Sequence, residues 1–182
     1  MLNGKKAMGI GQIFIFIVAA ITFALIMIFG YKAISGFLTS GEQVEFVQFK
    51  TGLEKAVKQI YTEYGSVRIE KFDLPVKYEQ ICLVDMDYPK PKISVEMDSL
   101  CAEDQIACDV WQQAMEEGGY DAVEANVFLT PPATVPIKVY QINIVNDNGE
   151  EQGYYCTKLN NGKFSLMLEG KGDRTEISPP PN

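Results

Sequence analysis

An uncharged run of 25 residues near the N-terminus, from Ala7 to Tyr31, constrains this chain more than any other feature. At about 1.5 Å of rise per residue, a helix over this run is longer than the hydrocarbon core of a bilayer, which is about 30 Å thick. Its side chains are almost all apolar, without the polar stripe that helices of soluble proteins keep. The run therefore predicts a transmembrane helix over residues 8–31, with the lipid bilayer as a partner.

The charges on the two sides of this helix indicate its orientation. Lys5, Lys6 and Lys32 are the only charged residues before Glu42, and all 24 acidic residues follow. Because basic flanks of a membrane helix lie mostly on the cytoplasmic side, we expect residues 1–7 in the cytoplasm. The protein is then a single-pass protein of the cell membrane, with its C-terminal domain extracytoplasmic.

The segment Lys5-Lys6-Ala7-Met8-Gly9-Ile10-Gly11-Gln12 places two lysines before glycines and a long apolar helix. This order resembles the prepilin-type signal of archaeal type IV pilins, in which a short basic leader is cut after a glycine and glutamine often follows the cut. The resemblance covers about the first 31 residues and implies cleavage between Gly11 and Gln12, or after Gly9. The sequence departs from the family pattern because the lysines are not adjacent to the glycine. Phe16 also stands where such pilins often carry glutamate.

All four cysteines, Cys82, Cys101, Cys108 and Cys156, follow the apolar helix. An even number of cysteines outside the cytoplasm predicts two disulfides, although four cysteines allow three connectivities. We favour Cys82–Cys156, because both residues lie in strand-like runs, and Cys101–Cys108, because this pair brackets the start of a helical pattern. A zinc site is the alternative, but no pair has C-x-x-C spacing and the chain has no histidine.

The sequence lacks the motifs of common catalytic centres. Without histidine there is no Ser-His-Asp or Cys-His centre, and no P-loop, G-x-G-x-x-G or G-x-S-x-G is present. Asp85 and Asp87 would point to the same side of a strand, and we interpret them as a solvated strand end. From Glu42 onward the chain has 13 basic and 24 acidic residues, a net charge of about −11 that repels phosphate backbones. We therefore predict no enzyme, no metal or cofactor site, and no nucleic-acid partner.

The rest of the chain predicts one α+β domain over residues 42–175, between a juxtamembrane hinge at residues 32–41 and a disordered Pro-rich tail at residues 176–182. Ser40-Gly41-Glu42-Gln43 has the form of a capping box, which predicts the start of an amphipathic helix there. We expect the apolar face of this helix to pack on a sheet. Its residues recur at steps of three or four: Phe46, Phe49, Leu53, Val57, Ile60 and Tyr64.

A mostly antiparallel sheet is expected after this helix. Asn160-Asn161-Gly162 is a hairpin signal between the last two strands, and the NDNGEE run at residues 146–151 predicts another turn between strands. One further short helix is expected near residues 103–117, with Trp111 buried under the sheet. The candidate strands lie at residues 66–72, 79–85, 91–96, 124–129, 135–145, 152–158 and 163–169.

Two functions compete on this sequence. The first is a pilin-like structural or surface protein that forms a homo-oligomer through its N-terminal helix, since the order of parts resembles type IV pilins. The second is a monomeric, membrane-anchored ectodomain that binds an unknown ligand. A cleaved secretory signal is a further alternative, because Ala33-Ile34-Ser35 has small residues where a signal peptidase requires them.

Overall fold

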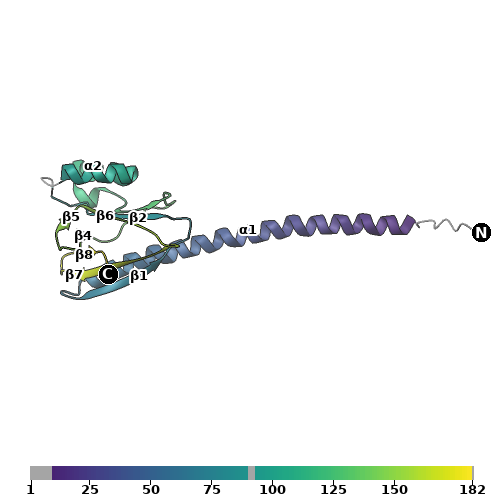
Figure 1. Cartoon of the computed structure of the whole chain (residues 1–182), viewed down its shortest axis with the longest axis horizontal. Coiled ribbons are helices and arrows are strands. Elements are labelled where there is room, and N and C mark those ends of the chain that lie inside the picture. The colour runs from purple at the N-terminus through teal and green to yellow at the C-terminus, as the bar shows by residue number, and fades with distance from the viewer. Residues whose placement is uncertain (1–9, 90–92, 182) are drawn as a thin grey trace, which may run out of the picture. The chain divides into compact units, whose positions relative to one another are not determined.

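The computed structural model describes residues 10–89 and 93–181, and its architecture is α+β (Figure 1). Its helices are α1 (Ile10–Tyr61), α2 (Ile93–Glu103), α3 (Gln105–Glu117) and the short 3-10 helix η2 (Gly119–Ala122). The chain divides into two compact units between Val44 and Glu45. All of the strands found in the described residues belong to the second unit.

The backbone of α1 is helical over all 52 residues from Ile10 to Tyr61, so the predicted helix start at Ser40 is wrong. A serine or glycine inside a helix costs at most about 1 kcal/mol relative to alanine. A helix end at this point would instead leave several backbone groups without partners, and the sequence places no proline there. Residues 32–41 are therefore helical, whereas their role as a point of motion stays a prediction.

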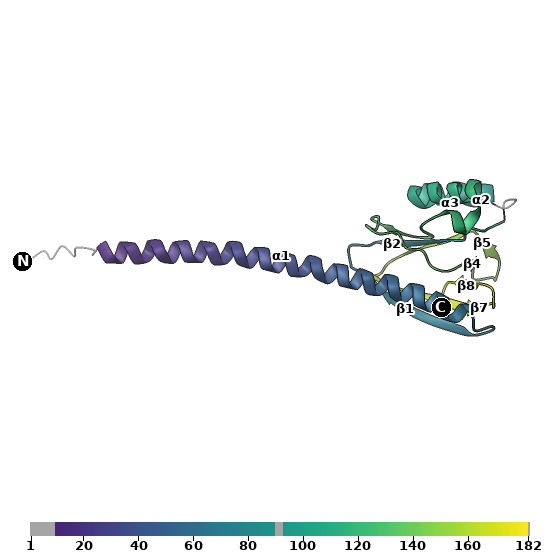
Figure 2. The same ribbon diagram turned by 180° about the vertical axis from the view of Figure 1, so that it is seen from behind.

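The strands of the second unit form two sheets, which Figure 2 shows from behind. The larger sheet has the order β1-β7-β8-β4-β5 and the smaller has the order β3-β2-β6. Strands β4 and β8 pair in parallel, and the other pairs are antiparallel. The bounds are β1 (Val67–Asp73), β2 (Gln80–Val84), β3 (Val127–Thr130), β4 (Ile142–Val145), β5 (Glu151–Gln152), β6 (Tyr154–Lys158), β7 (Lys163–Gly170) and β8 (Thr175–Ser178).

Two hydrophobic cores lie on opposite faces of the smaller sheet. Since successive side chains of a strand alternate between faces, Ile81 and Leu83 of β2 join the first core, whereas Cys82 and Val84 join the second. The first core also includes α1 and the larger sheet, and the second includes α2 and α3. Figure 1 shows this order, with α2 above β2 and β6. Trp111 is fully buried in the second core, which confirms the expected burial.

The amphipathic face of α1 packs as its periodicity predicts. Phe49, Leu53 and Val57 are at most 3% exposed, and Phe46 and Ile60 are also buried. Tyr64 is the exception, because it lies beyond the end of α1 and is 82% exposed. Within this stretch Gly52 is exposed, and a Cβ added there would meet no atom within 4 Å. Close packing inside the domain therefore does not explain this glycine.

The predicted hairpin between β6 and β7 is wrong, although its turn forms. Asn160 and Lys163 exchange two backbone hydrogen bonds, and Asn161 and Gly162 both have positive φ, as a tight turn requires. The strands then separate, because β6 pairs with β2 and β7 pairs with β1 and β8. A Cβ on Gly162 would lie 2.1 Å from the carbonyl oxygen of Leu74, so the turn is also held close to the end of β1.

Several other elements differ from the sequence prediction. The apolar residues of the expected strand at 91–96 continue into Met97 and Leu100, which are buried at helical spacing, and α2 begins at Ile93. The expected helix at 103–117 is α3, separated from α2 by Asp104, whose side chain accepts a hydrogen bond from the N–H of Ala107. Within residues 135–145 only β4 forms a strand. Residues 176–178, which the sequence assigns to the tail, belong to β8 (Thr175–Ser178).

Candidate functional site

The apolar part of α1, Ile13–Ile34, is long and hydrophobic enough to cross a membrane. It spans 22 residues with a mean hydropathy of 2.9, and its most hydrophobic stretch is 0% buried. Thr22 adds no unpaired polar group, because its hydroxyl donates to the carbonyl oxygens of Val18 and Ala19. The segment is compatible with membrane anchoring and also with a signal sequence.

The predicted leader lies at the edge of the described chain. The backbone of Gly11 and Gln12 belongs to the first turn of α1. Lys5, Lys6 and Gly9 lie outside the described residues. Cleavage at Gly11-Gln12 therefore stays a prediction.

Two disulfides lie in the second core or at its border, and they join the same cysteines as in the prediction. Cys82 of β2 and Cys156 of β6 are directly paired across the smaller sheet, with their Cα atoms 4.0 Å apart. Cys101 and Cys108 join α2 to α3, with a Cα separation of 4.9 Å. Because the first bridge closes a sequence separation of 74 residues and the second closes 7, the first constrains far more of the unfolded chain.

The interpretation of Asp85 as a solvated strand end is wrong, because its side chain is only 6% exposed. Asp85 follows the last residue of β2, and its N–H donates to the carbonyl oxygen of Gly153 at 2.8 Å. Its carboxylate accepts a hydrogen bond from the N–H of Asp87 at 3.0 Å. Burial is the main reason that the pKa of Asp85 rises to about 7, so this carboxyl changes charge near neutral pH.

Asp87 has a different environment, although it lies two residues away. Its side chain accepts hydrogen bonds from the N–H of Tyr120 at 3.0 Å and from the amide group of Gln141 at 3.3 Å. Asp87 therefore links the loop after β2 to η2 and to the segment before β4.

A hollow of about 220 Å³ lies beside the two aspartates, and Arg174 is the one basic residue among those that line it. The guanidinium of Arg174 is hydrogen-bonded to Asp173 at 2.9 Å. Burial raises the pKa of Asp85, and the charges of Asp87 and Glu151 also raise it, whereas the hydrogen bond from the N–H of Asp87 and the charge of Arg174 lower it. The arrangement can hold and release a proton at Asp85. Among the described residues, no group of three or more cysteine or acidic side chains is arranged to hold a metal ion.

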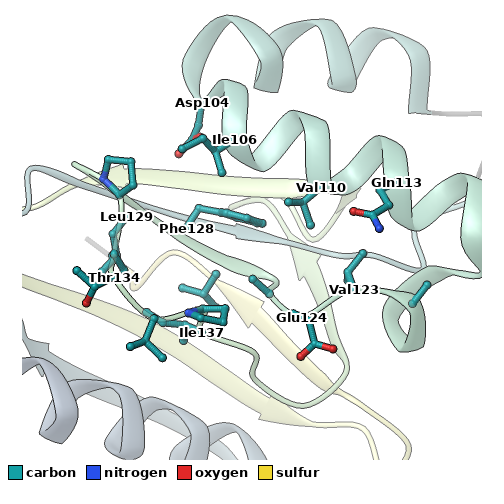
Figure 3. A pocket seen from close by; sticks show the side chains of 17 residues that line it. Asp104, Ile106, Val110, Gln113, Val123, Glu124, Phe128, Leu129, Thr134 and Ile137 are labelled. Carbon is teal, nitrogen blue, oxygen red and sulfur yellow. The ribbon is translucent and has the colours of Figure 1, made fainter.

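An apolar groove of about 370 Å³ lies between α3 and the segment that includes β3 and residues 131–137 (Figure 3). Ile106 and Val110 of α3 face Phe128 and Ile137 across it, as the side chains in Figure 3 show. Ile106 is 49% exposed. The sequence could not indicate this groove, because its two walls come from separate segments that meet only after β3 pairs with β2.

Comparison with known proteins adds no evidence about these features. Its sequence matches no protein-family model, and no curated protein or solved structure matches it.

Proposed function

We propose that this protein is a pilin-like subunit of the cell membrane, which assembles with copies of itself through α1. In this proposal the N-terminus is cytoplasmic and the disulfide-bearing domain is extracytoplasmic. The observation that carries the proposal is that no part of the hydrophobic stretch within Ile13–Ile34 is buried in the structure. Leaving one large apolar side chain in water costs about 1.5–3 kcal/mol, so this segment needs lipid or another protein around it.

Anchoring alone would satisfy the apolar side chains, so assembly needs a further reason. Lipid tails are as apolar as leucine, and helices associate in a bilayer mainly through close packing at small residues. Ala19, Ala20, Ala24 and Gly30 supply small residues within the apolar segment. The helical backbone of residues 32–41 also supports the proposal, because an assembled pilin favours one continuous N-terminal helix.

Crosslinking within the membrane tests assembly. Two residues that are two positions apart lie about 200° apart around a helix, so cysteines at Ala19 and Ile21 face nearly opposite sides. The described part of the chain has no free cysteine to interfere. In the A19C/I21C variant, oxidation in native membranes should give a ladder of trimers and larger species, seen by non-reducing electrophoresis.

The single variant A19C is the matched control, because one cysteine per chain can join only two chains. It should stop at the dimer under the same oxidation. A double variant that remains monomeric at native expression levels would contradict assembly through α1. That result would favour the second function, an anchored binding domain, for which the apolar groove of Figure 3 is the candidate ligand site.

A further inference from the structure

Strand β6 ends the smaller sheet, and one of its edges carries no partner strand in the described part of the chain. The register of β6 with β2 shows which backbone groups of β6 lie on that open edge. The 4.0 Å between the Cα atoms of Cys82 and Cys156 is typical of a non-hydrogen-bonded antiparallel pair. The hydrogen-bonded positions of β6 are therefore Tyr155 and Thr157. The N–H and C=O groups of Tyr154, Cys156 and Lys158 consequently point away from β2.

Backbone hydrogen bonds beyond both ends of β6 agree with this assignment. The N–H of Leu159 donates to the carbonyl oxygen of Glu79, and the carbonyl oxygen of Gly153 accepts from the N–H of Asp85. Gly153 and Leu159 therefore bond toward β2 and its flanking residues, in the same alternation as Tyr155 and Thr157. An open edge of this kind is a template for a further strand, unless the protein covers it.

A groove of about 340 Å³ lies beside this strand, between β6 and α2. Glu96, Ser99 and Glu103 line it from α2, one helical turn apart, and Tyr154 and Cys156 line it from β6. Glu96 already accepts hydrogen bonds from the hydroxyl of Tyr88 and from the N–H of Gly153. Glu103 is exposed and contacts the amide group of Gln80 at 3.3 Å. The wall of the groove is therefore acidic, and its floor carries backbone groups that have no partner strand in the described part of the chain.

We infer that this groove binds an extended peptide segment, which adds to β6 as a further strand and carries basic side chains at alternate positions. Backbone hydrogen bonds to the open edge provide affinity in such complexes, and alternate side chains provide specificity. The side chains of Tyr154 and Cys156 point to the second core, on the side that α2 and α3 cover. Alternate side chains of the added strand therefore point to the same side, where Glu103 favours lysine or arginine. This inference does not depend on assembly through α1.

A capped hexapeptide of alternating lysine and valine is the probe. It is titrated into the full chain in a neutral detergent at low salt, and NMR records the backbone amides. Binding should shift and protect the amides of Tyr154, Cys156 and Lys158 more than those of Tyr155 and Thr157. The same peptide with glutamate in place of lysine should bind at least tenfold more weakly, because it meets Glu96 and Glu103 with like charge.

Methylation of the peptide's own amides tests the strand pairing directly. In an antiparallel strand the lysine N–H groups face β6, so N-methylation at the lysines should abolish binding, while N-methylation at the valines should leave it unchanged. A parallel strand reverses the two results. Equal binding of both methylated peptides would overturn the inference, since it would show a purely electrostatic contact.

Variants of α2 locate the site. S99W should block the groove and abolish binding, whereas A102W, at an exposed position of the same helix that does not line the groove, should bind normally. E103Q should weaken binding roughly threefold to fivefold, and D98N, an equal change of charge outside the groove, should weaken it less. No binding by the wild-type chain at millimolar probe, or binding that S99W leaves intact, would also overturn the inference.

Discussion

Removal of the disulfide between β2 and β6 should lower the free energy of unfolding by about 4 kcal/mol in a Cys82→Ala, Cys156→Ala double variant. The physical reason is the sequence separation of 74 residues that this bridge closes, because the bridge greatly restricts the unfolded chain. For a domain of this size, the melting temperature should fall by roughly 10–20 °C. Thermal unfolding of the full chain in detergent, followed by the fluorescence of Trp111, measures the change.

The second disulfide is the matched control for this prediction. A Cys101→Ala, Cys108→Ala double variant removes a bridge between buried or half-buried residues of the same core, but it closes only 7 residues. The chain-entropy relation then gives a loss of about 2 kcal/mol. Equal losses in the two double variants would show that local packing around the sulfur atoms, and not the restriction of the unfolded chain, determines the effect.

Replacing Asp85 by asparagine should stabilise the domain above neutral pH by up to about 4 kcal/mol. The pKa of Asp85 rises from 3.8 to about 7 in the folded chain, and each pKa unit corresponds to about 1.4 kcal/mol. The folded state therefore holds this proton more tightly than the unfolded state does. The protonated carboxyl therefore stabilises the folded state fully below pH 3.8. This stabilisation is lost as the pH rises through 7.

The measurement is chemical unfolding of the wild type and of Asp85→Asn at several values between pH 4 and pH 8. Asparagine can still accept the hydrogen bond from the N–H of Asp87, so the local turn is kept. The difference in stability between variant and wild type should grow with pH and level off above pH 7. Asp98→Asn, which removes an exposed carboxylate on α2, is the control for the change of net charge. A constant difference for Asp85→Asn would contradict the assigned pKa.

Features that depend on a single stretch of sequence could be predicted without the structure. The apolar segment follows from composition alone, and the buried face of α1 follows from the regular spacing of residues such as Leu53 and Val57. The turn at residues 146–150 is also local, because the side chain of Asn146 accepts hydrogen bonds from the N–H groups of Asn148 and Glu150. In these cases the pattern of neighbouring residues is enough to indicate the feature.

Features that depend on distant segments could not be predicted in this way. The Asn160-Asn161-Gly162 turn is correct locally, but the partner of each flanking strand is decided by β2 and β1, far away in sequence. Strand β8 has Ile177 as its only large apolar residue, and it is held by pairing with β4 and β7. The burial of Asp85 likewise requires Gly153 and the neighbouring turns to be in place.

In the proposed topology, one membrane-spanning helix holds the disulfide-bearing domain outside the cytoplasm. Two matched variants, Asn3→Cys and Asn148→Cys, place one free thiol on each side of that helix. Asn148 is exposed in the turn between β4 and β5, and the described native cysteines are all in disulfides. A membrane-impermeant maleimide is added to intact cells and, in parallel, to opened cells.

We expect labelling of Asn148→Cys in intact cells, in a band that sediments with the membrane. Asn3→Cys should react only in opened cells, for as long as the leader remains on the chain. Labelling of Asn3→Cys alone in intact cells would invert the topology. A labelled Asn148→Cys chain found only in the medium would show that the apolar segment is a cleaved signal. Either result would contradict a membrane anchor with an extracytoplasmic domain.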